Sequence, residues 1–385
     1  MPPLEPRLRI AVLTRHFGRH KGGAENYAVS LSEQLAKRHE VHVYCQSEFN
    51  DNPLIQTHVM GFSLSKPRWL NMLLYSAWTY LQTRIGFDIV HSHENVFHGN
   101  VQTFHVKPVS HTLFHDKRGM ASFLAWLKVL FSLRLWAYLA VERARVRKPR
   151  HRLLITASQL LQDLYVHTFS LNVSDVRVLT PGVSMPAGIR GSKQSLRQDL
   201  ALPEDKYLML MVGHNYQKKG LGALLQALSL LPPDVALAVV GDTGQISIWQ
   251  LKAQQLGVAD RVCFLGQQTQ MEKIYQACDM FVHATLEDVF PIVVLEAMSQ
   301  GLPVVVSPAP FCLSSNLLTH AQEAWVLNDP HNGQEIANAI EQIRSQPSLQ
   351  ADFHQHAQAF VQRFRWDHLV EEQIRMYLEL LSKKQ

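Results

Sequence analysis

Short runs of consecutive apolar residues, many of them β-branched, recur along most of the chain. Runs that are apolar throughout, rather than alternating with polar residues, are typical of strands buried on both faces of a parallel sheet. Helical stretches separate them, as expected for βαβ units. The predicted strands are 9–14, 40–45, 88–93, 153–158, 176–183, 207–213, 236–241, 261–266, 280–284 and 303–307.

The order of these elements predicts an α/β protein with two doubly wound, Rossmann-like parallel-sheet domains. The break falls where apolar periodicity stops and Gly, Pro and Ser collect. Strands of the second half end in glycine at 213, 241 and 266. Since ligands bind beyond the carboxyl ends of such strands, we expect a cleft there, between the domains. The predicted parts are an N-terminal domain at 1–184, a linker at 185–206, a C-terminal domain at 207–350 and helices at 351–385 that pack back on the N-terminal domain.

A lysine pair follows the strand that ends at Gly213, in "MVGHNYQKKG" (211–220). Lys218 and Lys219 stand where the next helix begins, so their charge adds to the positive end of the helix dipole, an arrangement suited to a pyrophosphate. The segment is not a Walker P-loop, because GxxxxGK[ST] is absent. The alternative is a solvated lysine pair.

Acids and glycines mark two further helix starts. In "EDVFPIVVLEA" (287–297), Asp288 precedes Pro291, and Glu296 falls in the second turn. Two carboxylates beside exposed N–H groups suit a hydroxyl-rich ligand carrying phosphate, although a helix N-cap and an exposed helix charge are alternatives. Gly22 and Gly23 let the backbone approach a ligand, or form an ordinary turn.

Four histidines lie close together in "DIVHSHENVFHGNVQTFHV" (88–106). His91 and His93 share one face of a strand, and His98 and His105 follow it. A metal site on His91, His93 and His98 would indicate a metal-dependent hydrolase. Neither cysteine ligands nor HExxH is present, so we expect structural or ligand-contacting roles and no metal.

An apolar helix with basic flanks is predicted near 120–152. Lys128 and Arg134 interrupt the apolar run, which argues against a transmembrane span. Tryptophans beside cations are typical of a helix lying on an anionic membrane, and a core helix with a basic end is the alternative. The predicted membrane contacts are Trp126, Lys128, Arg134, Trp136, Arg143, Arg145, Arg147 and Lys148.

The bulk composition agrees with a cytoplasmic protein that meets an acidic partner. The formal net charge is +5, which suits a membrane surface, a nucleic acid or a phosphorylated substrate. The four cysteines are scattered, as in a reducing compartment. The N-terminal residues lack the pattern of a signal peptide. We therefore expect a cytoplasmic protein.

Together these segments resemble the retaining, two-domain (GT-B) glycosyltransferases of family 4. The match rests on Gly22 and Gly23, on the Lys218–Lys219–Gly220 triplet, and on two acids separated by seven residues. Asp288 and Glu296 have that spacing, with Glu287 as a rival one place out of register. The resemblance implies that both lysines bind the donor diphosphate.

The other roles also come from this resemblance. Glu296 would take ribose hydroxyls, Asp288 would hold hydroxyls of the transferred sugar, and His105 would lie near that sugar. N–H groups near Ile292 and Val293 would meet the phosphates. The expected catalytic set is His105, Lys218, Lys219 and Asp288, and the expected donor-binding set is Gly22, Gly23, Gly213, Lys218, Lys219, Asp288, Ile292, Val293 and Glu296.

Within the family the chain is most similar to lipopolysaccharide-core glucosyltransferases, as in "YLAVERA" (138–144) and "VGHNYQKKG" (212–220). This implies a UDP-linked sugar such as UDP-glucose as donor, a lipid-linked or lipopolysaccharide-core glycan as acceptor, and retention without a protein nucleophile. It also implies peripheral docking on the anionic cytoplasmic face of the inner membrane and no nucleic-acid partner. The absence of a DxD motif agrees with transfer that needs no metal or other cofactor. A catalytically inactive, membrane-bound scaffold is the remaining alternative.

Overall fold

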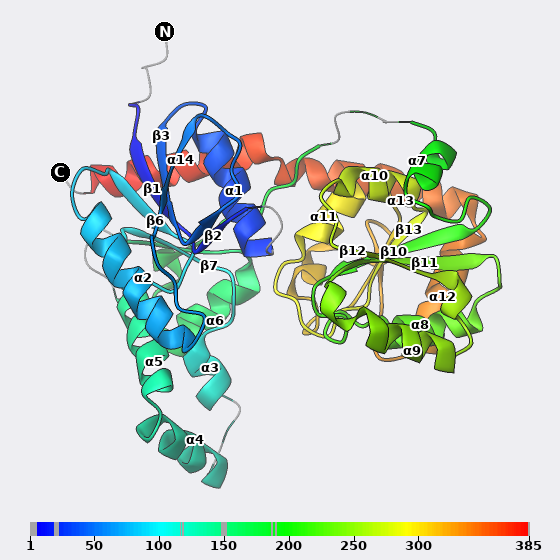
Figure 1. Cartoon of the computed structure of the whole chain (residues 1–385), viewed down its shortest axis with the longest axis horizontal. Helices are drawn as coiled ribbons and strands as arrows, with labels where there is room; N and C mark the ends of the chain where they lie inside the picture. Colours follow the sequence, from blue (N-terminus) through cyan, green and yellow to red (C-terminus); the bar gives the residue numbers. More distant parts are fainter. Residues whose placement is uncertain are drawn as a thin grey trace. The chain divides into compact units, whose positions relative to one another are not determined.

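The computed structural model describes residues 6–18, 23–115, 117, 119–147, 152–185, 188 and 191–383. The chain divides into two compact units, Met1–Pro181 with Trp366–Gln385, and Gly182–Arg365. Each unit is built on a parallel sheet with helices on both faces, which confirms the predicted fold class (Figure 1).

The first unit holds a seven-stranded sheet in the order β5-β3-β1-β6-β7-β8-β9 and a small β2-β4 pair, all parallel. Its strands are β1 (Arg9–Leu13), β2 (His16–Phe17), β3 (Glu40–Cys45), β4 (Ser47–Glu48), β5 (Ile55–Val59), β6 (Ile89–Ser92), β7 (Val101–Phe104), β8 (Leu153–Thr156) and β9 (Val176–Val178). Its helices are α1 (Gly23–Leu35), α2 (Arg68–Thr83), α3 (Val109–Phe114), α4 (Met120–Leu130), α5 (Leu133–Val146), α6 (Gln159–Phe169), the 3₁₀ turn η1 (Val173–Asp175) and α14 (Trp366–Ser382).

The second unit holds a six-stranded parallel sheet in the order β12-β11-β10-β13-β14-β15. Its strands are β10 (Tyr207–Gly213), β11 (Val235–Gly241), β12 (Val262–Gly266), β13 (Met280–His283), β14 (Val304–Val306) and β15 (Trp325–Val326). Its helices are α7 (Lys193–Asp199), α8 (Leu221–Leu230), α9 (Ile246–Gln255), α10 (Met271–Ala277), α11 (Ile292–Ser299), α12 (Gly333–Arg344) and α13 (Pro347–Val361), with 3₁₀ turns η2 (Thr243–Gln245), η3 (Ala259–Arg261), η4 (Leu313–Leu317) and η5 (Gln362–Phe364).

Alternation along β10 explains why this strand is apolar throughout. Leu208 and Leu210 point into the core beneath α10 and α11, whereas Met209 and Met211 point into the core beneath α8, α9 and α12. Figure 1 shows these two helix layers on opposite sides of the second sheet. Both faces of the strand are therefore buried, and its carboxyl end is left to present polar residues.

Two predicted boundaries differ from the structure. Most of the predicted linker belongs to the second unit, because Leu196 of α7 and Leu202 are buried in its core. The predicted C-terminal segment that packs back on the N-terminal domain, 351–385, is also too long. Only α14 belongs to the first unit, whereas Phe353 and Phe360 of α13 pack in the cores of the second. Apolar periodicity alone did not reveal which core each C-terminal helix joins.

Helices α4 and α5 form a hairpin, and α4 extends away from the body of the first unit (Figure 1). Val129 is 3% exposed, but most apolar side chains of α4 are open to solvent, among them Phe123 and Leu130, each 61% exposed. Across the described ranges, no helix is both long enough and apolar enough to cross a bilayer.

Candidate functional site

The loop between β10 and α8 presents the two lysines just before the helix begins. Gly220 is the N-cap of α8 with φ of 79°. A Cβ on Gly220 would lie 1.8 Å from the carbonyl oxygen of Ala284, so only glycine fits. The Lys218 N–H donates to the side chain of Asn215 at 3.0 Å, which closes the loop. Gly213 leaves room for the Lys219 stem, since a Cβ there would lie 2.6 Å from Lys219 Cγ.

Both lysines pair with acids that follow β13, which brings two of the sequence motifs together. Lys219 binds Oδ2 of Asp288, and His283 at the end of β13 lies 3.3 Å from the same oxygen. Lys218 pairs with Glu287 at 2.6 Å. The Asp288 side chain is 16% exposed, whereas that of Glu287 is 54% exposed. The two candidate acids thus occupy different environments, one half-enclosed and one open.

The electrostatics of the buried group favour an ionised Asp288. Burial by itself raises the pKa of this carboxyl, but the hydrogen bond with His283 and the Lys219 ammonium outweigh it and lower the pKa to about 2. Burial also lowers the pKa of His283, against the opposing pull of Asp288. A neutral His283 that donates through Nε2 to the carboxylate accounts for the lowered pKa of His283 and for the lowered pKa of Asp288.

Helix α11 begins at Ile292, with Pro291 as an N-cap that offers no side-chain hydrogen bond. Asp288 does not cap this helix. Its backbone instead pairs with Phe311 and Leu313, at 2.8 and 3.0 Å. The N-cap interpretation of Asp288 is therefore wrong, and the first N–H groups of α11, including those of Ile292 and Val293, have no side-chain cap.

Glu296, one turn into α11, is held rather than freely solvated. The Tyr275 hydroxyl of α10 donates to Oε2 of Glu296 at 2.8 Å. Burial, and then the neighbouring Glu296 charge, raise the pKa of that tyrosine. The carboxylate therefore keeps one oxygen fixed by a neutral donor, and its alternative interpretation as an exposed helix charge is wrong.

In the first unit the histidines take separate partners. His93 Nδ1 lies 3.1 Å from His105 Nε2, and Tyr27 of α1 contacts both rings, with centroids 5.4 and 5.2 Å away. His91 hydrogen-bonds Tyr377 and Thr103, each at 2.6 Å. The interactions of this cluster tie β6, β7, α1 and α14 together.

The predicted alternative of a metal site on these histidines is not supported by their geometry. His98 bonds Thr79 of α2 at 2.8 Å, away from the other two rings. Among the described residues, no group of three or more His, Cys, Asp or Glu side chains is arranged to hold a metal ion. Burial lowers the pKa of His91 to about 3 and those of His98 and His105 to about 4, so all three rings are neutral at pH 7.

Of the glycine pair near the start of the chain, Gly22 lies outside the described residues. Gly23 is the first residue of α1, and a Cβ built there would meet nothing within 4 Å. The backbone is thus open on the side where a side chain would project. A ligand-binding role of Gly23 stays a prediction.

The predicted membrane contacts fall into two groups. Trp126, Lys128, Arg134, Trp136, Arg143 and Arg147 are exposed, and Lys148 lies outside the described residues. Arg145 is only 5% exposed, so its prediction as a membrane contact was wrong. Its guanidinium donates to Gln102, Asn95 and the Thr103 carbonyl. An Arg side chain that joins α5 to β7 and to the loop holding Asn95 is part of the interior, and its place in a basic run gave no sign of this.

Three residues of the second-unit site were not predicted: His283, Tyr275 and Asn215. Tyr275 contacts an acid 21 residues away, Asn215 accepts from a backbone N–H of its own loop, and His283 contacts the carboxylate five residues after it. The one available signal was a histidine at the end of the apolar strand "MFVH" (280–283). A polar residue at the carboxyl end of a parallel strand is placed where ligands bind.

Comparison with protein families covers most of the chain. Residues 21–185 match the model described as Glycosyltransferase Family 4. Residues 192–360 match the model described as Glycosyl transferases group 1. The second match contains both lysines and both acids of the site.

Individual relatives are distant. Lipopolysaccharide glucosyltransferase WaaG of Escherichia coli (strain K12) is 24% identical over 232 residues, which span 58% of this chain and 61%, less than two thirds, of that protein. An uncharacterized glycosyltransferase of Methanocaldococcus jannaschii, MJ1607, is 24% identical over 96% of this chain and 98% of its own length.

Solved structures share the fold. A crystal structure of WaaG superposes with a TM-score of 0.82 at 21% identity, covering 96% of this chain and 99% of that one. Anabaena Alr3699/HepE in complex with UDP and glucose gives 0.73 at 20% identity, covering 97% and 100%. At these identities the likeness shows the fold.

Proposed function

This chain belongs to the GT-B glycosyltransferases, with a family 4 domain followed by a group 1 domain, and we propose that it moves a hexose from a UDP-linked sugar to a lipid-linked or lipopolysaccharide-core glycan. The anomeric configuration would be retained. The second unit would bind the donor, and the first would supply the acceptor surface.

The observation that carries this proposal is the Lys219–Asp288–His283 cluster beside the uncapped start of α11. In glycosyl transfer the anomeric carbon becomes positive while the diphosphate leaves with negative charge. Two ammonium groups and free helix N–H groups lie in one unit, where they would stabilise that departing charge. A cluster of this kind has no need of a metal ion, and we propose transfer without one.

The acids would hold the donor rather than attack it. Oδ2 of Asp288 is taken by Lys219 and His283, and within the described part of the chain nothing donates to Oδ1. A carboxylate oxygen in that position would accept hydroxyls of the transferred sugar. Glu296, fixed by Tyr275, would accept the ribose hydroxyls. We propose that neither acid acts as a nucleophile and that retention proceeds through the leaving phosphate.

The identity of the donor is proposed from the relatives. WaaG is named a glucosyltransferase, and Alr3699/HepE was crystallised with UDP and glucose and also with UDP-glucose. UDP-glucose is therefore the first donor to try. His105, next to His93 and Tyr27 in the first unit, is proposed to contact the sugar as a neutral imidazole.

The α4–α5 hairpin would hold the enzyme on the cytoplasmic face of the inner membrane. Exposed apolar side chains cover α4, including Trp126, which is 63% exposed, and Lys128 and Arg134 lie among them. Aromatic and aliphatic residues interspersed with cations suit the interface of an anionic bilayer. A lipid-linked acceptor would be met there.

Donor turnover tests the proposal. Purified protein is incubated with UDP-glucose, UDP-galactose or GDP-mannose and a panel of truncated lipopolysaccharide-core glycolipids. UDP release and an acceptor mass raised by one hexose are expected with a UDP-sugar. Asp288→Asn should lower kcat/KM about a hundredfold, as does removal of a preorganised contact. The neighbouring Glu287→Gln should lower it less than tenfold.

The outcomes separate the alternatives. A larger loss in Glu287→Gln than in Asp288→Asn would assign the motif to the rival acid. Turnover of GDP-mannose in place of UDP-sugars would refute the UDP donor while keeping the site. UDP binding without turnover on any acceptor would indicate the inactive scaffold.

A further inference from the structure

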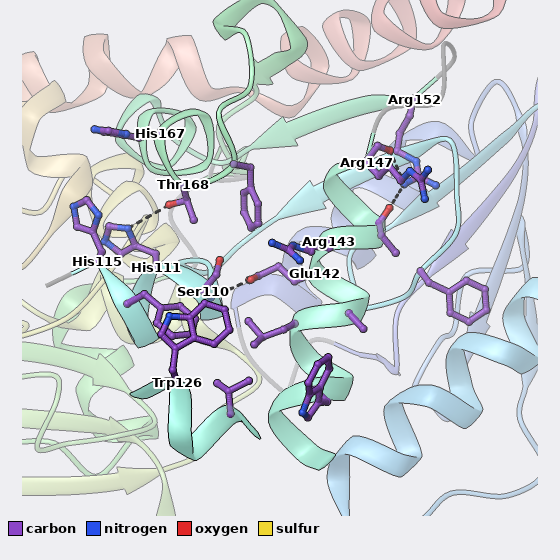
Figure 2. A pocket seen from close by; sticks show the side chains of 18 residues that line it. Ser110, His111, His115, Trp126, Glu142, Arg143, Arg147, Arg152, His167 and Thr168 are labelled. Atoms are coloured by element: carbon purple, nitrogen blue, oxygen red, sulfur yellow. Dashed lines mark hydrogen bonds between the residues drawn. The ribbon is translucent and has the colours of Figure 1, made fainter. Parts of the chain in front are cut away.

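A large cavity lies within the first unit, apart from the lysine–acid site of the second. Its volume is about 1360 Å³, and α3, α4, α5 and α6 form its walls. Figure 2 shows side chains from these elements pointing into it. Sites for drug-sized molecules commonly occupy 300–1,000 Å³, so this cavity has room for a larger or elongated ligand.

One wall of the cavity is apolar and aromatic. It is formed by Phe114, Trp126, Val129, Trp136 and Leu139. Trp126 and Val129 belong to α4, whose outer side chains Phe123 and Leu130 are exposed and lie outside the cavity lining. Apolar side chains of α4 therefore lie both on the outer face of the hairpin and in the cavity lining, with the exposed Lys128 among them in sequence.

The cavity is also cationic. Figure 2 shows Arg147 and Arg152 at one end and Arg143 nearer the middle. In the part of the chain that the structure describes, no carboxylate pairs with Arg143 or Arg147. Arg152 donates through Nη1 to backbone carbonyls, and its buried Nε has no hydrogen-bond partner.

Among the described residues that line the cavity there is one acid, Glu142, which offsets only part of this positive charge. Glu142 is 7% exposed and accepts from the N–H groups of Val109 and Ser110, at 2.5 and 3.0 Å. Its charge is thus bound to the start of α3. The buried hydroxyl of Ser110, at the same place, has no partner and remains a donor for a ligand.

From this combination we propose that the cavity binds one anionic phospholipid taken from the bilayer. An acyl chain would lie against the apolar wall, and the phosphate would pair with Arg143, Arg147 and Arg152. The lining selects an anionic amphiphile, because a neutral apolar ligand leaves Arg143 and Arg147 without an anionic partner and a free phosphate leaves the aromatic wall unused. The inference rests on the proposed function in one respect, namely that the protein lies on a membrane from which the lipid can be taken.

The test separates the cavity from the outer face of α4. Calorimetry measures binding of dihexanoyl phosphatidylglycerol and dihexanoyl phosphatidylcholine to the full chain below their micelle concentrations, and of inorganic phosphate. The wild type should bind the glycerol lipid at least tenfold more tightly than the choline lipid, as expected for several arginines near one anionic group. Ala140→Trp fills the cavity from an exposed position on α5 and should weaken binding at least tenfold.

The matched control is Leu130→Ser, on the outer face of α4. It should leave binding of the monomeric lipid within about twofold while weakening attachment to vesicles. Equal binding of both lipids, unchanged binding in Ala140→Trp, or inorganic phosphate binding as tightly as the anionic lipid would each overturn the proposal.

A titration with UDP on the same samples keeps this result distinct from the proposed function. Ala140→Trp should bind UDP as the wild type does, because the cavity and the lysine–acid site belong to different units. Loss of lipid binding with UDP binding intact supports the cavity assignment. Failure of UDP to bind the wild type would refute the donor proposal and leave the lipid result standing.

Discussion

The charge of Asp288 is controlled by two neighbours, and it has a measurable consequence for stability. Lys219 and His283 lower the pKa of this carboxyl from its ordinary value of 3.8 to about 2. A depressed carboxyl pKa stabilises the folded state above the ordinary value, and the stabilisation is lost as the pH falls toward the folded value. The stabilisation by ionised Asp288 should therefore be lost as the pH falls from about 5 to about 2.

Urea unfolding of the wild type and Asp288→Asn tests this window. The difference between the two pKa values corresponds to roughly 2 kcal/mol. The gap in unfolding free energy between the two proteins should narrow by roughly 1 to 2 kcal/mol between pH 6 and pH 2.5. A gap that stays constant across this range would show that Asp288 titrates as an ordinary exposed carboxyl.

At this scale the sequence predicted the acids but not what holds them. The spacing of Asp288 and Glu296, and the neighbouring lysine pair, sufficed to nominate the charged groups. Tyr275 was missed because its role arises from a contact between two helices, which no spacing records, and His283 because its contact with Asp288 depends on the path of the loop after β13. Arg145 was misassigned for the converse reason, since one residue of a basic run can point inward.

Among the elements, the β10–α8 loop depends on one glycine. Gly220→Ala should destabilise the second unit by about 3 kcal/mol, because φ is positive and the added Cβ meets the Ala284 carbonyl. Gly222→Ala, two residues on inside α8, would place its Cβ 3.8 Å from Trp249 and should change stability by less than about 1 kcal/mol. Chemical denaturation of both variants measures the change in unfolding free energy. Equal losses of stability in the two variants would contradict the contact predicted between a Cβ at residue 220 and the Ala284 carbonyl.

The α4–α5 hairpin is the element that the membrane proposal rests on. Leu130→Ser should weaken partition onto vesicles containing phosphatidylglycerol by roughly tenfold, the effect of withdrawing one buried leucine. Leu230→Ser is the control, since Leu230 is 54% exposed at the end of α8 in the second unit. Sedimentation with vesicles measures both. Equal losses in the two variants would mean that the hairpin has no special part in binding.

Element prediction succeeded for most strands that are buried on both faces, although the buried strand β7, "VQTF" (101–104), was not among the ten because polar Gln102 and Thr103 occupy its centre. All ten predicted strands correspond to strands of the two sheets. The edge strand β5, "IQTHV" (55–59), was missed because polar Gln56 and His58 interrupt its apolar pattern. The two-residue strand β15 is too short to carry a pattern.

For the whole molecule, the chain leaves the first unit, forms the second and returns. Trp366 and Tyr377 of α14 are 7% and 0% exposed, and each contacts aromatic side chains of the first unit. The last helix is therefore part of the first core although it lies farthest from it in sequence.

Truncation after Arg365 tests this arrangement. Amides of β1 and β6 should exchange hydrogen markedly faster in the truncated protein, because the hydrogen bond of Tyr377 to His91 and the packing of Trp366 on Tyr27 are lost. Amides of β10 and β11 should be unaffected. Faster exchange in both units would contradict the independence of the two cores.

The two-domain architecture followed from the sequence because buried parallel strands have a strong local pattern. The domain boundaries could not be predicted from the sequence, because the assignment of α7, α13 and α14 to a core depends on packing between distant segments. The same limit applies to the cavity of the first unit, which has no linear signature.

Isothermal titration of the purified protein with UDP tests the central claim most directly. UDP should bind the wild type, and Lys219→Met should weaken that binding by about a hundredfold. At one hundred times its dissociation constant, UDP should also raise the unfolding free energy by about 2.7 kcal/mol. No heat of binding with UDP, or a Lys219→Met variant that binds it as tightly as the wild type, would contradict the account.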